Sequence, residues 1–274
     1  MNKFKNLLLC ICIMTAVALA GCGGATETDK NEKAGQTDSG VTNNSETNQT
    51  GSGVPDSSDA IVTGGVGLDD ETALDGNVDF AALQAENEDV IAWLQVPGTN
   101  IDYPVLQSWE EDDYYATRNA HKQDDKAGAL YIEMANMPNM CDFNTVIHGN
   151  GTEGLFGELV NYTNPDFFGE NEEFYIYLDG NVLKYEIWAA FERDNTSLIR
   201  DYDFSYIEGC KDFLNDVYNS KIMGKQIREG WEDVSEYHFL VTLTVDNPDS
   251  DKQLVVIGAL VYDAAGTIDR MILE

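Results

Sequence analysis

A long segment near the N-terminus cannot form a packed core. From Gly23 to Asp75 there is no aromatic residue, and Thr, Ser, Asn, Asp, Glu and Gly dominate. Such a composition buries too little apolar surface to offset the conformational entropy lost on ordering. We therefore predict a disordered linker over residues 22–76, with a root-mean-square reach of roughly 40 Å. The folded domain is then confined to residues 77–274, which is enough chain for one hydrophobic core.

The first 21 residues have the pattern of a bacterial lipoprotein signal peptide. Lys3 and Lys5 precede an apolar run from Leu7 to Ala20, which is short for a membrane-spanning helix, and Leu19-Ala-Gly-Cys22 follows. Cleavage before Cys22 would leave a lipidated N-terminus, whose buried methylene groups contribute about 0.8 kcal/mol each to membrane binding. We predict a lipid-anchored protein on the extracellular face of the cell membrane. A plain secretory signal or an uncleaved anchor is the alternative.

The net charge of the chain argues against a nucleic-acid partner. The formal net charge is −33, and loss of Lys3 and Lys5 leaves 14 basic against 49 acidic residues, or −35. This charge repels nucleic acid, so no nucleic-acid partner is predicted.

The cysteines fall into two groups. Cys10 and Cys12 leave with the signal peptide, while Cys141 and Cys210 remain in the folded domain. Their spacing does not demand a disulfide, so we predict two buried thiols, with one disulfide as the alternative.

The acidic segment after residue 246 has some features of a calcium loop. Asn247, Asp249 and Asp251 alternate like calcium ligands, yet Lys252 stands where such loops need Gly, and no Glu follows at the required distance. A solvated hairpin is therefore predicted, with no metal and no cofactor.

Apolar periodicity predicts a mainly β fold. Asp79 can cap a helix, and Phe80, Leu83, Val90, Ile91 and Leu94 recur at helical spacing until Pro97 and Gly98 end the pattern. A further helix is expected at 204–220. Short β-branched and aromatic runs predict strands at 101–106, 129–132, 145–148, 174–178, 182–191, 237–245 and 253–262. Many strands and few helices favour a closed or nearly closed antiparallel barrel.

Six patches in order along the chain resemble a class B sortase. They are the ranges 90–107, 113–115, 127–132, 144–147, 154–159 and 183–187, the first reading Val-Ile-Ala-Trp-Leu-Gln-Val-Pro-Gly-Thr-Asn-Ile-Asp-Tyr-Pro-Val-Leu-Gln. The resemblance implies an eight-stranded sortase barrel with N-terminal helices and a helix before the seventh strand. It also implies the cell envelope of a Gram-positive type of bacterium. In sortases, a Cys attacks a sorting-signal backbone and an amine resolves the resulting thioester.

Three positions depart from the family's reactive residues. Asp246 closes Thr242-Leu-Thr-Val-Asp246 where the resemblance expects Cys, Asn150 stands in place of His, and Gln253 stands in place of Arg. A carboxylate is a poor nucleophile toward an amide, Asn exchanges no proton near neutral pH, and Gln brings no positive charge to an oxyanion. A slip of one residue in the last strand would put Lys252 in the place of Gln253.

Other residues could replace the missing groups. His148 lies two positions before Asn150, so both should face the same side of a strand, where His148 either packs at the barrel rim or serves as a relocated base. Cys141 is a candidate substitute nucleophile. His121 and His238 are expected to be solvated or hydrogen-bonded, and Cys210 to be buried on a helix.

We therefore predict an inactive sortase-like lipoprotein with a peptide groove near His148 and Thr244. It would bind or scaffold an envelope protein, a pilus protein or a sorting-signal peptide. The rival hypothesis is a divergent enzyme, either a transpeptidase using Cys141 or a hydrolase using Asp246 with His148. A structural spacer or decaying paralogue is the third reading, because fold alone does not supply function.

Overall fold

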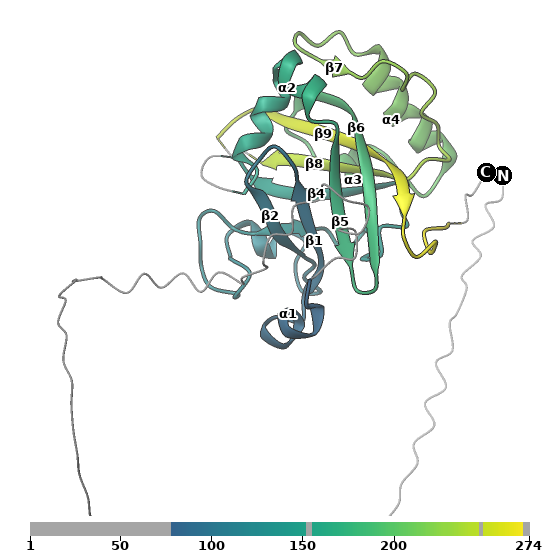
Figure 1. Ribbon diagram of the computed structural model, residues 1–274. Coiled ribbons are helices and arrows are strands. Elements are labelled where there is room, and N and C mark those ends of the chain that lie inside the picture. Colours follow the sequence, from purple (N-terminus) through teal and green to yellow (C-terminus); the bar gives the residue numbers. More distant parts are fainter. Residues whose placement is uncertain (1–77, 152–154, 247–248, 271–274) are drawn as a thin grey trace, which may run out of the picture. The chain divides into compact units, whose positions relative to one another are not determined.

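A computed structural model of the protein describes residues 78–151, 155–246 and 249–270 (Figure 1). The predicted signal peptide, the predicted lipidation site Cys22 and the whole of the predicted linker lie outside these ranges. In the described part, none of the helices combines the length and apolar character needed to cross a membrane. The helical elements are α1 (Phe80–Glu86), η2 (Tyr114–Ala116), η3 (Gly157–Thr163), α2 (Pro165–Glu170), α3 (Leu198–Asp201) and α4 (Ile207–Asn219).

The predicted N-terminal helix is present but shorter than expected. The Asp79 carboxylate accepts a hydrogen bond from the Ala82 backbone N–H at 3.0 Å, and the helix ends at Glu86. The prediction that helical structure continues over Val90, Ile91 and Leu94 is wrong, because these residues lie in a strand. This strand is buried on both faces, so its apolar residues do not alternate and match the helical template by chance.

Within the described ranges, nine strands form one sheet. They are β1 (Val90–Val96), β2 (Ile101–Leu106), β3 (Leu130–Ile132), β4 (Asn144–Asn150), β5 (Glu173–Leu178), β6 (Asn181–Asp194), β7 (Gln226–Ile227), β8 (Leu240–Asp246) and β9 (Lys252–Asp263). Their order is β5-β1-β2-β3-β4-β8-β9-β6-β7, and β5 also pairs with β6. That last pairing closes eight strands into a barrel and leaves β7 outside the ring. The predicted eight-stranded barrel is confirmed.

The barrel is not antiparallel throughout, as the strand pattern had favoured, because it contains two parallel pairs. β2 pairs with β3 in parallel, and β4 pairs with β8 in parallel. Parallel neighbours require long connections rather than tight turns. The connection before β8 contains α4, which confirms the predicted helix before the seventh strand of the barrel. Asp179 and Gly180 form the tight turn of the hairpin that joins β5 and β6, with Gly180 at a φ of 76°.

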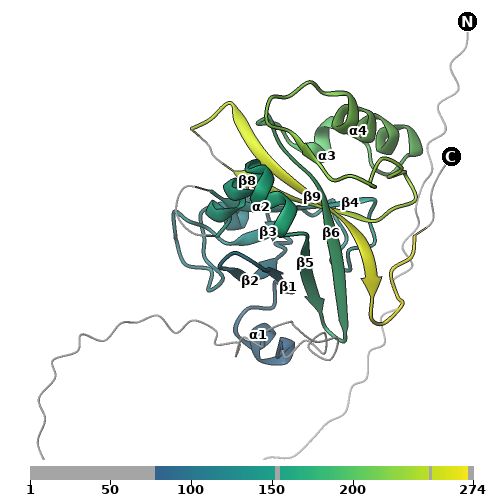
Figure 2. The same cartoon turned by 45° about the horizontal axis from the view of Figure 1, so that its top comes forward.

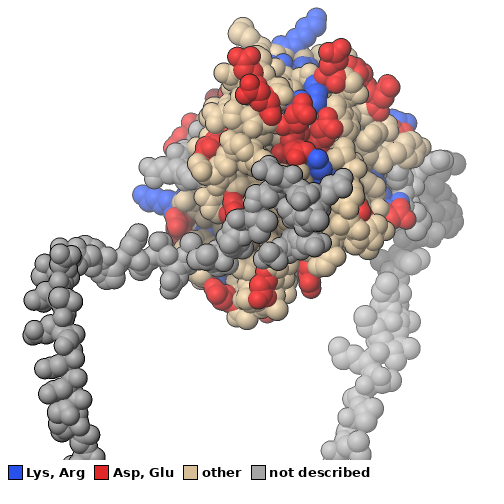
Figure 3. Space-filling view, in the orientation of Figure 1, with Lys and Arg blue, Asp and Glu red and all other residues tan. Residues whose placement is uncertain are grey.

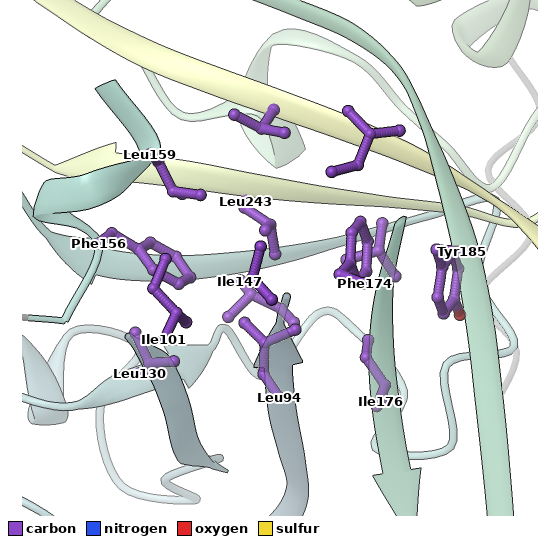
Figure 4. Packing of buried hydrophobic residues seen from close by; sticks show 14 of the residues in the cluster. Leu94, Ile101, Leu130, Ile147, Phe156, Leu159, Phe174, Ile176, Tyr185 and Leu243 are labelled. Atoms are coloured by element: carbon purple, nitrogen blue, oxygen red, sulfur yellow. The ribbon is translucent and has the colours of Figure 1, made fainter. Parts of the chain in front are cut away.

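The barrel interior is packed with apolar side chains (Figure 4). Leu94, Ile147, Phe174, Tyr185 and Leu243 are fully buried there and come from five different strands. A second apolar cluster lies outside the barrel, where α3 and α4 cover β6 and β9 (Figure 2). The helices α3 and α4 cover only part of the sheet. At the carboxyl ends of β4 and β8 and at the start of β9, the polar side chains of His148, Asp246 and Lys252 are half-buried or exposed.

Candidate functional site

The three positions that depart from the sortase pattern meet at one edge of the sheet. Because β4 and β8 are parallel, their carboxyl ends lie side by side, and Asn150 is the register partner of Asp246. β9 begins at the same edge, where Leu254 pairs with Val245 and Gln253 precedes it. Backbone pairing therefore brings Asn150, Asp246 and Gln253 together from three strands.

Strand alternation directs the polar side chains away from the barrel interior. Gly149 lies between His148 and Asn150, and a Cβ on Gly149 would come within 2.6 Å of side-chain atoms of Leu130 and Phe156. A larger residue at this inward position would require the Leu130 and Phe156 side chains to move, so the position favours glycine. Its two neighbours face outward, as expected for alternate residues of a strand.

His148 is held between two carboxylates. Its Nδ1 lies 3.3 Å from an Asp246 oxygen, and its Nε2 lies 3.3 Å from Glu133 Oε1. The Nε2 contact is an ion pair rather than a well-aligned hydrogen bond, since Nε2 has no hydrogen-bond partner. The side chains of His148 and Glu133 are 12% and 11% exposed, whereas that of Asp246 is 32% exposed. We name His148, Asp246 and Glu133 the histidine–carboxylate cluster.

The two neighbouring carboxylates keep the His148 ring protonated. Burial alone would lower its pKa, but the contacts with Asp246 and Glu133 outweigh that effect and raise the pKa to about 9. The contact with His148 in turn lowers the pKa of Glu133. At neutral pH the ring is therefore an imidazolium and has no free lone pair to accept a proton.

Two further side chains fix the orientation of His148. Thr244 Oγ1 lies 3.1 Å from Nδ1 and 3.3 Å from the backbone oxygen of Ile147. The Tyr131 ring stacks on the imidazole at a centroid distance of 5.0 Å and an interplanar angle of 18°. His148 therefore packs against Tyr131 and Thr244 near the end of β4, while its charge and its contact with Glu133 were not predicted.

The amide side chains at the other two positions bind backbone oxygens. Asn150 Nδ2 donates to the Lys126 carbonyl at 3.2 Å. Gln253 is buried, and its Nε2 donates to the Thr196 carbonyl at 2.8 Å. Lys252, the alternative at a slipped register, is ion-paired with Asp194.

The two cysteines lie away from the histidine–carboxylate cluster. Cys141 and Cys210 are both free and buried, which confirms the prediction of two buried thiols. Cys141 precedes the start of β4 at Asn144, so it is near the opposite end of that strand from Asn150. Burial raises the pKa of the Cys210 thiol to about 11. The structure therefore does not place Cys141 beside His148.

His121 and His238 make local contacts, as expected. His121 Nδ1 lies 3.8 Å from a Glu86 oxygen, and His238 Nδ1 accepts a hydrogen bond from the Ser235 backbone N–H at 3.1 Å. Among the described residues, no group of three or more His, Cys, Asp or Glu side chains is arranged to hold a metal ion. Part of the acidic segment weighed as a calcium loop, residues 247–248, lies outside the described ranges.

Comparison with known proteins agrees with this architecture. The chain is 27% identical over 184 residues to sortase B of Listeria monocytogenes, covering 65% of this chain and 72% of that protein. A crystal structure of a Streptococcus pyogenes class B sortase involved in pilus biogenesis matches with a TM-score of 0.58 and 29% identity, covering 67% of this chain and 98% of that one. Sortase B of Clostridium perfringens matches with a TM-score of 0.58 and 25% identity, over 66% and 99% of the two chains.

The chain contains a class B sortase-like domain. No family model matches the chain. In this sortase-like domain, Glu133 is the site residue that sequence reasoning missed. The only local signal is its place directly after the apolar run of β3, and nothing in the sequence shows that it faces His148.

The predicted peptide groove near His148 and Thr244 stays a prediction. Thr244 is buried, and His148 is largely covered by its neighbours. Two cavities of about 510 Å³ each lie on the outer side of the sortase-like domain, and neither is lined by His148 or Thr244. On the face seen in Figure 3, acidic side chains gather in the upper half with a few basic ones among them.

Proposed function

We propose that this protein is a lipid-anchored surface protein whose sortase-like domain binds or scaffolds envelope proteins without joining them. The observation that carries the proposal is the histidine–carboxylate cluster. Asp246 stands where the resemblance expects a thiol, and it faces an imidazolium 3.3 Å away. A carboxylate in an ion pair is an even poorer nucleophile toward an amide than a free one.

The hydrogen bonds of the neighbouring side chains support the same proposal. Gln253 donates to the Thr196 carbonyl and Asn150 to the Lys126 carbonyl, so both amides have local partners. Oxyanion stabilisation needs donors directed at the reacting centre, and one such donor contributes about 10²- to 10³-fold to the rate. Loss of a nucleophile and its base together costs about 10⁶-fold in well-studied proteases.

The rival function is a hydrolase that uses Asp246 with His148. The short distance between the two side chains favours it, but the raised pKa of His148 counts against it, because a protonated ring cannot act as a general base at neutral pH. A transpeptidase using Cys141 is disfavoured because that thiol lies near the other end of β4.

A transpeptidation assay separates these functions. The purified protein is incubated with a sorting-signal peptide and an amine acceptor, and products are followed by mass spectrometry. We expect no product from the natural chain and none from Asp246→Cys, since the base and the cation are still missing. The triple variant Asp246→Cys, Asn150→His and Gln253→Arg is the positive comparison, because it restores all three groups. Turnover by the natural chain that disappears in Cys141→Ala or Asp246→Asn would refute the proposal.

Binding is tested separately with the same sorting-signal peptide and with envelope proteins. The class of ligand is suggested by the similar Streptococcus pyogenes protein, which is involved in pilus biogenesis. Retention of pilus or wall proteins is compared between the whole chain and residues 22–76 alone. Equal retention by the two would contradict a binding role of the sortase-like domain.

A further inference from the structure

A cavity of about 510 Å³ lies beside the start of β4, whereas His148 and Asp246 lie towards the carboxyl ends of β4 and β8. It is formed by the connection between β3 and β4, the connection between α3 and α4, and Arg270 near the C-terminal end of the described chain. Phe143 lines it and immediately precedes β4, whereas Asn150 ends that strand. Six residues of strand correspond to about 20 Å, so Phe143 is far from Asn150, whereas Glu133 of the cluster is only two residues from Ala135 in the cavity wall.

Aromatic rings form much of the cavity wall. They belong to Phe143, Tyr202, Phe204 and Tyr206. The Phe143 and Phe204 centroids are 5.5 Å apart, and the Tyr202 ring stacks on Phe204 at 5.9 Å. Because these rings already pack on one another, the wall is formed without a ligand, as is usual for small-molecule sites.

The mouth of the cavity exposes apolar side chains. Met137 and Tyr206 both line it, and each is 49% exposed. Large apolar side chains that stay exposed beside a preformed cavity are a common feature of binding sites. The cavity therefore offers an apolar surface both inside and at its entrance.

Arginine is rare in this chain but concentrated at the cavity. The sequence contains five arginines, at positions 118, 193, 200, 228 and 270, and two of them line this cavity. Arg270 is already engaged, since it donates to the backbone carbonyls of Glu236 and His238 and lies 4.5 Å from the Phe239 ring centroid. Through these contacts Arg270 stabilises the cavity wall.

Arg200 is different. It lies on α3 and is exposed, and within the described ranges its guanidinium has no hydrogen-bond or ion-pair partner. Glu133 is near enough for Arg200 to contribute to its lowered pKa, but the Glu133 carboxylate is already engaged by His148 and by the Ser197 hydroxyl at 3.4 Å. Arg200 thus keeps its forked donors available for another carboxylate.

The acidic side chains of the cavity have local partners. Asp142 accepts hydrogen bonds from the Met137 backbone N–H at 2.6 Å and from Asn136 Nδ2 at 3.1 Å, and burial raises its pKa. Asp203 accepts a hydrogen bond from the Ser205 backbone N–H at 3.1 Å. Beyond the cavity, repulsion from the acidic surface is screened over about 8 Å at physiological salt.

We propose that this cavity binds a ligand with an apolar body and a carboxylate group. The apolar body packs against the aromatic rings, and the carboxylate pairs with the Arg200 guanidinium. Such chemistry is found in small aromatic or aliphatic acids and in the C-terminal residue of a peptide, and the test below distinguishes these two sources.

The test is a titration of the purified chain with 4-phenylbutyrate, followed by amide chemical shifts in two-dimensional NMR. We expect shifts at residues 137, 142–143 and 199–206. The matched alcohol, 4-phenylbutan-1-ol, should bind roughly tenfold more weakly, because it has no carboxylate to pair with the Arg200 guanidinium. The peptide Ala-Ala-Phe and its C-terminal amide form the second arm. Binding of the free peptide but not of the amide assigns the site to peptide C-termini, whereas binding of 4-phenylbutyrate alone assigns it to small acids.

Two variants and one control complete the test. Arg200→Gln should weaken binding of 4-phenylbutyrate roughly tenfold, and Tyr206→Ala should weaken it as well; both side chains are exposed, so folding is retained. Arg118→Gln removes an arginine elsewhere on the surface, over the Tyr114 ring, and should leave binding unchanged. Equal binding of acid and alcohol, unchanged binding by Arg200→Gln, tighter binding of 4-phenylbutylamine, or no binding at millimolar concentration would each overturn the proposal.

Discussion

The two faces of β4 and β8 differ sharply although the same strands form both. On the inner face, Ile147 and Leu243 are fully buried among apolar side chains of the barrel. On the outer face, His148 and Asp246 form an ion pair. Apolar packing tolerates exchange of one hydrophobic residue for another of similar volume, whereas the outer face depends on particular charged groups. A sortase-like barrel can therefore persist while the chemistry at its edge changes.

The largest loss of stability is expected when the apolar packing on the inner face of the barrel is disrupted. Leu243→Ala removes a side chain that is 0% exposed and leaves a cavity among residues from several strands. We expect a loss of about 2–5 kcal/mol in the free energy of unfolding, measured by urea denaturation. Leu243→Met conserves volume and should cost less than about 1.5 kcal/mol. Equal costs for the two variants would show that this position is not tightly packed.

The next largest effect is expected when the positive charge of His148 is removed from the outer face. His148→Gln leaves the largely buried Glu133 carboxylate without its counter-charge, so we expect a loss of about 3 kcal/mol in unfolding free energy. The double variant His148→Gln with Glu133→Gln should recover part of this loss, since it removes both partners of the pair. If the double variant is less stable than the single one, the ion pair is not what stabilises this face.

The same pair predicts a dependence of stability on pH. The pKa of His148 is raised to about 9 in the folded protein, above an unfolded value near 6.5. Its contribution is therefore fully present below about pH 6.5 and is lost as the pH rises through 9. The shift corresponds to roughly 3 kcal/mol at most. The measurement is the difference in unfolding free energy between the natural chain and His148→Gln, which should shrink between pH 7 and pH 9.5 and would contradict the charge assignment if it stayed constant.

The smallest effect is expected at the exposed partner. Asp246 is 32% exposed, so Asp246→Asn should change the unfolding free energy by less than about 1 kcal/mol. The pKa of His148 should nevertheless fall, because one of the two carboxylates that raise it is gone. An NMR titration of the His148 ring measures this directly. An unchanged pKa would assign the whole effect to Glu133.

Much of the fold could be predicted from the sequence. Alternating or continuous apolar runs located the strands, and the six motifs predicted the eight-stranded closure that pairing of β5 with β6 confirms. The helical interpretation of 90–94 failed because a strand buried on both faces has no period of two. The parallel pairing of β4 with β8 was missed because an apolar pattern reports which face is buried and not which strand lies alongside.

The candidate site was predicted less completely. Motif positions identified Asn150, Asp246 and Gln253 as the departures from the family pattern, and strand pairing shows that they lie at one edge. The role of Glu133 depends on contacts made by residues distant in sequence, so no local pattern could reveal it. The protonation of His148 follows from its two carboxylate neighbours rather than from its own position in the sequence.

The long-range pairing of β4 with β8 has a consequence for biosynthesis. His148 and Asp246 are separated by 98 positions, so a growing polypeptide exposes the first for the time needed to make the second. Non-local contacts of this kind form late and slow the folding of β-rich domains. Until β8 emerges, the imidazole lacks one of the two carboxylates that raise its pKa, and the unpaired edge of β4 is open to association with other chains.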